Sequence, residues 1–419
     1  MWLSLALACV EPDAPKPPAD TADPVTGDTA PPTDTAPPTD TGGTTPADSG
    51  VTRADADGDG TPDLADCDDT DPAIHPGADD IPVDLVDQDC DGVDLCAPGA
   101  LPEYPGELTF DDAGAEDQMR AFCAEYASID GNLNLRLDVI TDLSGLACLR
   151  CVRGEVSIYS TALTSLDGLE QLAYVGGVVD LDHNQELTDI RALSGLRVAH
   201  GGVDFQSSPA LTSLEGLDGL VGGVDTFSLY NTGIVTLDHV PLLDSVRHVS
   251  LYSNYDLVDL TGLSAIEAAQ SVQIRGSAGV RDLSPAVHLA PTGSLDLGNM
   301  SGGGLGDWSL TTLAYLSITR TTNVVALTGL DGLTEVDGQV EISGNERLAS
   351  LAGLALLTEV SDDLIIEDNP DLTDLSALHG VTWIGGALVI RDNDSLSDAE
   401  IDALIAAIGT ENIRDGVEW

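Results

Sequence analysis

A short motif of two apolar residues separated by one other residue recurs along residues 133–390 and constrains the fold more than any other feature. Successive motifs begin 21 to 24 residues apart. Each motif alternates with a period of two, which is typical of a short strand with one buried face. A repeat of this length lies in the leucine-rich range, so the sequence predicts a mainly β, leucine-rich-type solenoid of about 12 turns. The motifs are Leu133/Leu135, Val156/Ile158, Val179/Leu181, Val203/Phe205, Phe227/Leu229, Val249/Leu251, Val272/Ile274, Leu295/Leu297, Leu316/Ile318, Val340/Ile342, Leu364/Ile366 and Leu388/Ile390.

A column of polar residues lies three positions beyond the second apolar residue of these strands. An inward polar side chain at a tight bend satisfies backbone groups that a solenoid would otherwise bury unpaired. We therefore predict that this column is structural. Its members are Asn184, Asn254, Asn345, Asn369 and Asn393, with Thr161, Ser208, Thr232, Ser277 and Thr321 in other turns.

The ends of the predicted solenoid need caps, because an open end exposes a sheet edge and the core. Helical spacing predicts a cap helix over Ala113–Tyr126 at the first end and another over Asp398–Ile408 at the second. Hydrophobic residues make up 42% of the chain and aromatic residues only 4%, which suits the small, uniform core layers of a repeat protein.

The repeats combine Gly-x-Leu/Val-x-Ile with Leu-x-x-Leu-x-Gly-Leu and a preceding helix-like segment. In this they resemble the receptor L domains, which form the ligand-binding lobes of the insulin and epidermal growth factor receptors. The resemblance implies an L-domain-like solenoid over 131–397, with an N-terminal cap over 96–130 and a C-terminal cap over 398–419. It also implies a general role in recognition, but no particular partner.

Six cysteines follow Cys9, which leaves fifteen connectivities open. In the receptor lobes a disulfide braces the first cap, and the resemblance therefore implies a Cys96–Cys123 bond. Cys148 and Cys151 would then form a second structural bridge. The alternatives for this Cys-x-x-Cys pair are a thiol catalyst or half of a zinc site, but no second such pair exists and the His residues are scattered.

Residues 55–94 contain fifteen Asp and neither Lys nor Arg, a density of negative charge that predicts a cation site. Carboxylates occupy positions 1, 3, 5, 9 and 12 of a loop that begins at Asp55, with Gly60 at position 6 and the Thr61 carbonyl at position 7. This is the spacing of a calcium loop. The departure is Asp66 at position 12, which is one methylene shorter than the usual Glu. A second Asp-x-Asp-x-Asp-Gly segment begins at Asp87.

The Asp, Cys, Pro and Gly positions from Asp66 to Gly92 resemble the MopE-type metal-binding motif of bacterial surface proteins, which is itself similar to thrombospondin type 3 calcium repeats. The resemblance implies a Cys67–Cys90 disulfide. We predict a calcium-binding module over 53–95, and the alternative is an unliganded acidic spacer. The predicted ligands are Asp55, Asp57, Asp59, Thr61, Asp63, Asp66, Asp68, Asp69, Asp71, Asp87, Asp89 and Asp91.

The first residues of the chain are apolar and lead into Ala6-Leu7-Ala8-Cys9, which resembles a bacterial lipobox. The resemblance implies a signal peptide over 1–9 and a lipid anchor on Cys9. The alternative is a free or disulfide-bonded Cys9 in a secreted protein. Residues 10–52 contain ten Pro, ten Thr and seven Asp, a composition that predicts a disordered linker.

The formal charge of the chain is −57, from 72 acidic and 15 basic residues. Such a charge excludes nucleic acid as a partner, because nucleic acids are bound through their phosphates. A secreted solenoid enzyme of the polysaccharide-lyase kind would need a basic residue facing clustered acids on the sheet. The single Lys, Lys16, lies in the linker. We therefore expect a protein that is not an enzyme.

Three of the eight Tyr fall in one outward column of the predicted sheet, and Tyr and Arg are the side chains that most often anchor interfaces. This pattern suggests a recognition face for a protein or a carbohydrate. The simpler alternative is cross-strand aromatic packing that only stabilises the sheet. The residues of the suggested face are Tyr159, Asp180, Asp182, Asp204, Tyr230, Tyr252 and Arg275.

Together these features predict a non-catalytic recognition or adhesion protein with a calcium-stabilised acidic region. We expect it on the outer membrane or cell surface as a lipoprotein, or secreted. The alternatives are a passive structural or spacer protein and, less favoured, a secreted carbohydrate-active enzyme.

Overall fold

A computed structural model of the chain describes residues 57–59, 61, 68, 70–76, 78, 88, 101–240 and 243–419. The predicted anchor, the linker and several predicted site residues lie outside this part of the chain. These are Cys9, Asp55, Asp63, Asp66, Cys67, Asp69, Asp87, Asp89, Cys90, Asp91 and Cys96.

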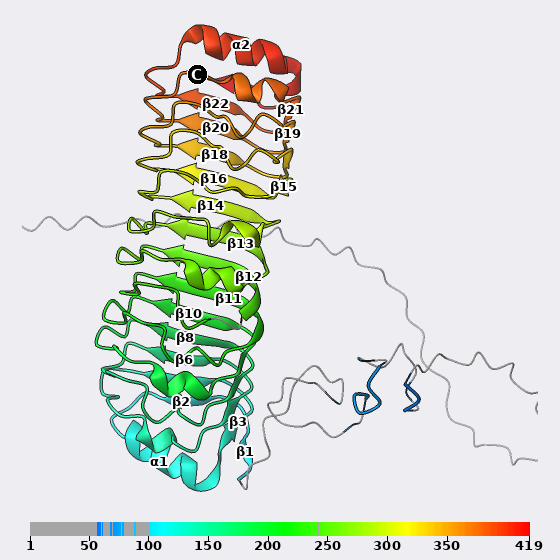
Figure 1. Ribbon diagram of the computed structural model, residues 1–419. Coiled ribbons are helices and arrows are strands. Elements are labelled where there is room, and N and C mark those ends of the chain that lie inside the picture. The colour runs from blue at the N-terminus through cyan, green and yellow to red at the C-terminus, as the bar shows by residue number, and fades with distance from the viewer. Residues whose placement is uncertain are drawn as a thin grey trace, which may run out of the picture. The chain divides into compact units, whose positions relative to one another are not determined.

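Residues 101–419 form a solenoid whose main wall is a 14-stranded parallel sheet with its strands in chain order (Figure 1). The twelve predicted motifs lie on twelve neighbouring strands of this sheet, which confirms a mainly β solenoid. The outermost strands, β2 and β23, add one strand at each end. The strands are β2 (Leu108–Phe110), β4 (Leu133–Arg136), β6 (Val156–Tyr159), β8 (Val178–Asp182), β10 (Gly202–Gln206), β11 (Gly222–Tyr230), β12 (Leu243–Tyr252), β13 (Ala268–Arg275), β14 (Ser294–Gly298), β16 (Tyr315–Thr319), β18 (Val340–Ser343), β20 (Leu364–Glu367), β22 (Leu388–Arg391) and β23 (Val417–Glu418).

A second wall consists of two small parallel sheets and short 3₁₀ turns. The first small sheet contains β1 (Glu103–Tyr104), β3 (Ser128–Ile129), β5 (Cys151–Val152), β7 (Tyr174–Val175) and β9 (Val198–Ala199), and the second contains β15 (Thr312–Leu313), β17 (Glu335–Val336), β19 (Glu359–Val360) and β21 (Trp383–Ile384). The 3₁₀ turns are η1 (Ser144–Leu146), η2 (Arg191–Gly195), η3 (Thr261–Ala265), η4 (Val287–Leu289), η5 (Ser376–Gly380) and η6 (Thr410–Asn412).

The inward residues of all these turns form one continuous hydrophobic cluster. Both apolar residues of every predicted motif are buried in it. The core consists mostly of Leu, Val and Ile, with few large aromatic side chains such as Phe205, Phe227 and Trp308. A single turn of this size cannot bury its own apolar face, so each turn depends on its neighbours for a core.

The predicted polar column is structural. Asn345 donates from Nδ2 to the Ile318 carbonyl at 2.9 Å, and its Oδ1 accepts from the Thr321 N–H at 3.1 Å and from the Thr321 hydroxyl at 2.8 Å. Asn184 and Asn254 repeat this pattern on their own neighbours. Because Asn345 also donates to the side chain of Asn369, the column forms a hydrogen-bonded ladder inside the solenoid.

The two predicted cap helices form, at opposite ends of the solenoid (Figure 1). The first, α1 (Ala115–Glu125), lies within the predicted range, buries Met119 and Phe122, and packs on η1. The second, α2 (Asp398–Ile408), has the predicted bounds, and the side chain of Ser397 caps it by accepting from the Glu400 N–H. In the part of the chain that the structure describes, no helix is long and apolar enough to cross a membrane.

The disulfides of the first cap differ from the prediction. Cys123 on α1 bonds to Cys148, which follows η1, and their Cα atoms are 5.6 Å apart. The predicted Cys96–Cys123 and Cys148–Cys151 bonds are therefore wrong. The physical reason is that η1 packs against α1 and brings Cys148 to the helix, within the span that a disulfide requires.

Cys151 faces a different environment from Cys148. It begins β5, where its side chain packs with Tyr174 and Val198 away from the main core. Cys151 is itself disulfide-bonded, and its partner lies outside the described residues. The Cys-x-x-Cys pair is thus divided between two different bridges, which leaves it neither a dithiol nor half of a zinc site.

Candidate functional site

The residues of the predicted recognition face lie together on the outward side of the main sheet. Strand register places one row of side chains across six strands, in the order Tyr159, Asp182, Gln206, Tyr230, Tyr252 and Arg275. The same register pairs Asp180 with Asp204 in a second row. We call Tyr159, Asp180, Asp182, Asp204, Tyr230 and Tyr252 the tyrosine-acid face.

Tyr230 and Tyr252 form the aromatic part of this face. Their ring centroids are 5.2 Å apart and their planes differ by 22°, so the two rings stack across neighbouring strands. The side chains nevertheless stay 40% and 36% exposed. Because each ring covers one face of the other, the pair supports the sheet and still offers ring edges and hydroxyl groups to a partner.

The acidic part of the face is poorly compensated. Burial raises the pKa of the Asp180 carboxyl to about 6, helped by the negative charges of Asp204 and Asp182 and opposed by a hydrogen bond from Ser157. Asp204 accepts from Gln206 at 2.9 Å through Oδ2, while its buried Oδ1 has no hydrogen-bond partner among the described residues.

The one ion pair that the structure gives these carboxylates involves a histidine. His183 Nδ1 lies 2.6 Å from Asp182 Oδ1. Within residues 101–240 and 243–419, neither Lys nor Arg forms an ion pair with Asp180, Asp182 or Asp204. The face therefore carries negative charge that no Lys or Arg of these residues balances.

Arg275, the last residue of the predicted face, is engaged within the sheet. Its Nη1 lies 3.0 Å from Asp296 Oδ2, and its Nη2 donates to the Thr319 hydroxyl at 2.9 Å. The guanidinium passes over Gly298, where a Cβ atom would come within 3.0 Å of Arg275 Nε and 2.8 Å of the Thr319 hydroxyl oxygen. Arg275 therefore braces three neighbouring strands and offers little to a ligand.

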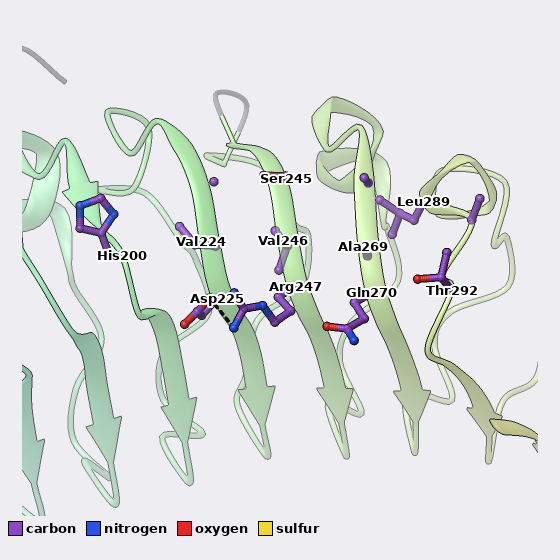
Figure 2. A pocket seen from close by; sticks show the side chains of 13 residues that line it. His200, Val224, Asp225, Ser245, Val246, Arg247, Ala269, Gln270, Leu289 and Thr292 are labelled. Carbon is purple, nitrogen blue, oxygen red and sulfur yellow. Dashed lines mark ion pairs between the residues drawn. The ribbon is translucent and has the colours of Figure 1, made fainter. Parts of the chain in front are cut away.

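A shallow groove of about 680 Å³ crosses the N-terminal halves of β11, β12 and β13 (Figure 2). These three strands are long and run unbroken where other turns have separate short strands. The groove contains an exposed ion pair between Arg247 Nη1 and Asp225 Oδ1, at 3.2 Å. Sequence reasoning missed it, since the apolar motifs of these turns look like all the others.

In the described residues of the acidic module, Asp side chains accept hydrogen bonds from backbone amides two residues further on. Asp57 Oδ1 accepts from the Asp59 N–H at 3.2 Å, and Asp59 Oδ1 accepts from the Thr61 N–H at 2.6 Å. Asp68 Oδ1 accepts from both the N–H and the hydroxyl of Thr70, which lowers the pKa of the Asp68 carboxyl. Asp71 accepts from the Ala73 N–H at 3.1 Å.

One oxygen of this module is a candidate ligand for a cation. The Asp59 side chain is only 3% exposed, and its Oδ2 has no hydrogen-bond donor among the described residues. A buried carboxylate oxygen without a partner is costly, and a metal ion removes that cost. Among the described residues, no three metal-binding side chains meet at one point. Of the predicted ligands, Asp57, Asp59, Thr61, Asp68 and Asp71 lie in the described part of the chain.

His75 is a residue that sequence reasoning missed. Its Nε2 lies 3.9 Å from Asp59 Oδ2. Nothing in the sequence spacing signals this approach, because a calcium loop uses oxygen ligands and the two residues are sixteen positions apart.

Residues 66–94 match the copper-binding MopE family model, whose description is "Putative metal-binding motif". This match confirms the similarity predicted for the acidic module. The comparison with curated proteins finds no match. Among solved structures, the chain is similar to the crystal structure of an internalin from Listeria monocytogenes, at 15% sequence identity and a TM-score of 0.47, over 76% of this chain and 86% of the internalin.

Proposed function

We propose that this chain is a non-catalytic surface recognition protein in which the solenoid presents the tyrosine-acid face to a partner. The observation that carries the proposal is the exposed stack of Tyr230 and Tyr252 beside carboxylates that no Lys or Arg of residues 101–240 and 243–419 neutralises. Large exposed aromatic side chains of this kind dominate binding energies at protein interfaces.

The chemistry of the face favours a partner that donates hydrogen bonds or carries positive charge. The stacked rings leave their edges and hydroxyl groups outward, and Asp180, Asp182 and Asp204 accept hydrogen bonds. An extracellular protein with exposed Lys or Arg fits this arrangement best. A carbohydrate that reads the face through its hydroxyl groups is the second fit.

We further propose that the acidic module binds calcium and is stiffened by it. The spacing of Asp55, Asp57, Asp59 and Thr61 supports this, as does the buried Oδ2 of Asp59. The name of the matched family mentions copper, whereas a loop of hard oxygen ligands suits Ca²⁺. A lipid on Cys9 would hold the protein on the outer membrane or cell surface, with residues 10–52 as a spacer.

The test compares the full chain with a Tyr230→Ala/Tyr252→Ala variant on a panel of purified extracellular proteins and glycans in calcium buffer. We expect the variant to lose at least about tenfold in affinity for any partner that the wild type binds. Its melting temperature should fall by several degrees, since the stacked pair contributes about 0.5–1.5 kcal/mol beyond the apolar area that the two rings bury. Trp383→Ala, at a 38% exposed aromatic residue on the other wall, is the matched control.

Two outcomes would contradict the proposal. Equal binding by the wild type and the tyrosine variant would place recognition elsewhere. A large loss of stability in the tyrosine variant, with no partner for the wild type, would favour a passive spacer whose aromatic pair only holds the sheet together.

A further inference from the structure

The Asn ladder inside the solenoid repeats one contact from turn to turn. The side chain of each Asn reaches back to the preceding turn, where its Oδ1 accepts from a backbone N–H and its Nδ2 donates to the carbonyl three residues before that N–H. All these distances lie between 2.7 and 3.1 Å. The contacts join Asn184 to Thr161 and Ile158, Asn254 to Thr232 and Leu229, Asn345 to Thr321 and Ile318, Asn369 to Asn345 and Ile342, and Asn393 to Asn369 and Ile366.

The last turn of the ladder presents the same two backbone groups, but no further Asn of the chain binds them. They are the N–H of Asn393 and the carbonyl of Ile390, again three residues earlier. Among the described residues, the Asn393 N–H donates to no acceptor, and no side chain donates to the Ile390 carbonyl. Strand β23 pairs only with Leu388 and Val389, so no paired strand covers this bend.

An open pocket of about 420 Å³ lies at this bend, at the end of the solenoid that carries α2 (Figure 1). Ile390 and Asn393 both line it. Its apolar lining comes from Leu396, from Ile401 on α2 and from Trp419, which is 57% exposed. The pocket therefore combines one backbone donor, one backbone acceptor and apolar walls, which is the usual make-up of a binding site for a small group.

The ladder contact shows which group fits the two backbone atoms. Oδ1 and Nδ2 of one side chain both point to the preceding turn, so the amide needs its C=O and an N–H on the same side. A primary carboxamide has this arrangement, whereas the trans amide of a peptide bond carries the two groups on opposite sides. A carboxylate cannot donate to the Ile390 carbonyl, and Asp392 and Asp398, which also line the pocket, repel it.

We infer that this pocket binds the carboxamide of an Asn side chain on a partner polypeptide. The bound Oδ1 accepts from the Asn393 N–H and the bound Nδ2 donates to the Ile390 carbonyl, as Asn393 itself does on the turn before. Leu396, Ile401 and Trp419 contact the neighbouring atoms of the partner. The inference does not rest on the proposed function, because β22, α2 and Trp419 form the pocket and the tyrosine-acid face lies on β6 to β12.

The experiment titrates the full chain, labelled with ¹⁵N in its Asn residues, with N-acetyl-asparagine N′-methylamide and follows the backbone amide signals by NMR. Asn393→Thr assigns one signal by removing it, and Thr is tolerated at the same place in other turns, as at Thr161 and Thr321. On titration the Asn393 signal should shift at least about threefold further than that of Asn369, because the Asn369 N–H already donates to Asn393 Oδ1.

N-acetyl-leucine N′-methylamide is the matched control probe, since it has the same backbone and a branched side chain without polar atoms. We expect it to bind at least about fivefold more weakly, because it forms neither hydrogen bond. Trp419→Ala should weaken binding of the asparagine probe at least about threefold by removing an apolar wall. Trp383→Ala, at an exposed aromatic residue on β21, should bind the probe like the wild type.

Four results would overturn the inference. They are an Asn393 signal that does not move, equal shifts at Asn369 and Asn393, equal affinity for the two probes, and a Trp419→Ala variant that binds the asparagine probe as tightly as the wild type does.

Discussion

The acidic module and the solenoid carry negative charge in different ways. Residues 55–94 contain fifteen Asp without a single Lys or Arg, while residues 131–419 contain 41 acidic and 12 basic residues. In the described solenoid Asp296 is the one buried acid, and the other acids are partly or fully exposed around a continuous core of Leu, Val and Ile. The Asp-rich segment has little apolar sequence with which to offset its charge repulsion. The solenoid can therefore fold on its own core, whereas we expect the proposed cation to be needed for order in the module.

Metal removal tests this difference most directly and should have the largest effect. In chelator we expect proteolytic cleavage within residues 57–91 to accelerate by about a hundredfold. A cation that binds only the folded module stabilises it, so its removal raises the fraction of open, cleavable chain. The solenoid should melt at the same temperature with and without chelator. Its unfolding can be followed through Trp308, which is buried in its core, while residues 55–94 contain no Trp. If chelator instead changes the melting temperature of the solenoid, the two regions do not differ in their need for a cation.

The second prediction concerns the Asn ladder, which belongs to the solenoid alone. Asn345→Ala removes its hydrogen bonds to Ile318 and Thr321 and leaves buried backbone groups unpaired. We expect urea unfolding to show a loss of about 3 kcal/mol, since each buried unsatisfied group costs about 1–3 kcal/mol. Asn323→Ala, at a loop residue that donates to the Ser301 carbonyl, should cost under about 1 kcal/mol and is the control. A loss that appears only in chelator would mean that the two regions fold together.

The repeat explains why so much of the solenoid could be predicted from the sequence. One strand motif of two apolar residues is ambiguous, but the spacing repeats twelve times and each copy supports the others. The same periodicity separates inward from outward residues, so the composition of the tyrosine-acid face followed from the sequence. Helix α2 was predicted to the residue from the helical spacing of its apolar residues, and in the structure Ser397 caps its first turn.

Features that depend on one particular contact could not be predicted. The Cys123–Cys148 bond depends on how α1 packs against η1, which no repeat encodes. The groove over β11, β12 and β13 lies where the pairing of β11 with β12 shifts register at Gly222 and Gly223, which the apolar motifs do not encode. The approach of His75 to Asp59, at 3.9 Å, joins two positions that no repeat relates. Arg275 was assigned to the face because its side chain points outward. In the structure it binds Asp296 and Thr319 instead. This contact is possible because Gly298 has no Cβ atom to block the guanidinium.

The third prediction concerns how protonation of Asp180 changes the stability of the solenoid with pH. The pKa of this carboxyl is raised from 3.8 to about 6, so the folded protein binds the proton more tightly than the unfolded chain. The free energy of unfolding should therefore rise as the pH falls from 7 toward 4, by on the order of 1 kcal/mol once solvent screening is allowed for. Asp180→Asn should remove most of this rise and be the more stable protein at pH 7. Urea unfolding across this pH range measures both effects.

Two further groups of acids sharpen this prediction. Asp204→Asn removes a negative charge that raises the pKa of Asp180, so the rise in the free energy of unfolding between pH 7 and pH 4 should become smaller.

Four other carboxylates of the solenoid have lowered pKa values. In each, a side chain and a backbone N–H two residues further on donate to the carboxylate, as at Asp142, Asp189, Asp282 and Asp374. The stability that these four carboxylates contribute is present above pH 3.8 and is lost as the pH falls below that value. Stability that falls steadily from pH 7 to pH 4 would contradict the assignment of Asp180.

The smallest expected effect separates the rings of the tyrosine-acid face from their hydroxyl groups. Tyr230→Phe/Tyr252→Phe keeps the stacked rings and removes both hydroxyls, so the free energy of unfolding should change by less than about 0.5 kcal/mol. The alanine pair should lose at least about 1 kcal/mol, because it also removes the stack and the apolar area that the two rings bury. If the hydroxyls contact a partner, the phenylalanine pair weakens binding while its stability stays that of the wild type. A phenylalanine pair as unstable as the alanine pair would instead mean that the hydroxyls serve the sheet, as the Asn ladder does, and that the face was built for packing.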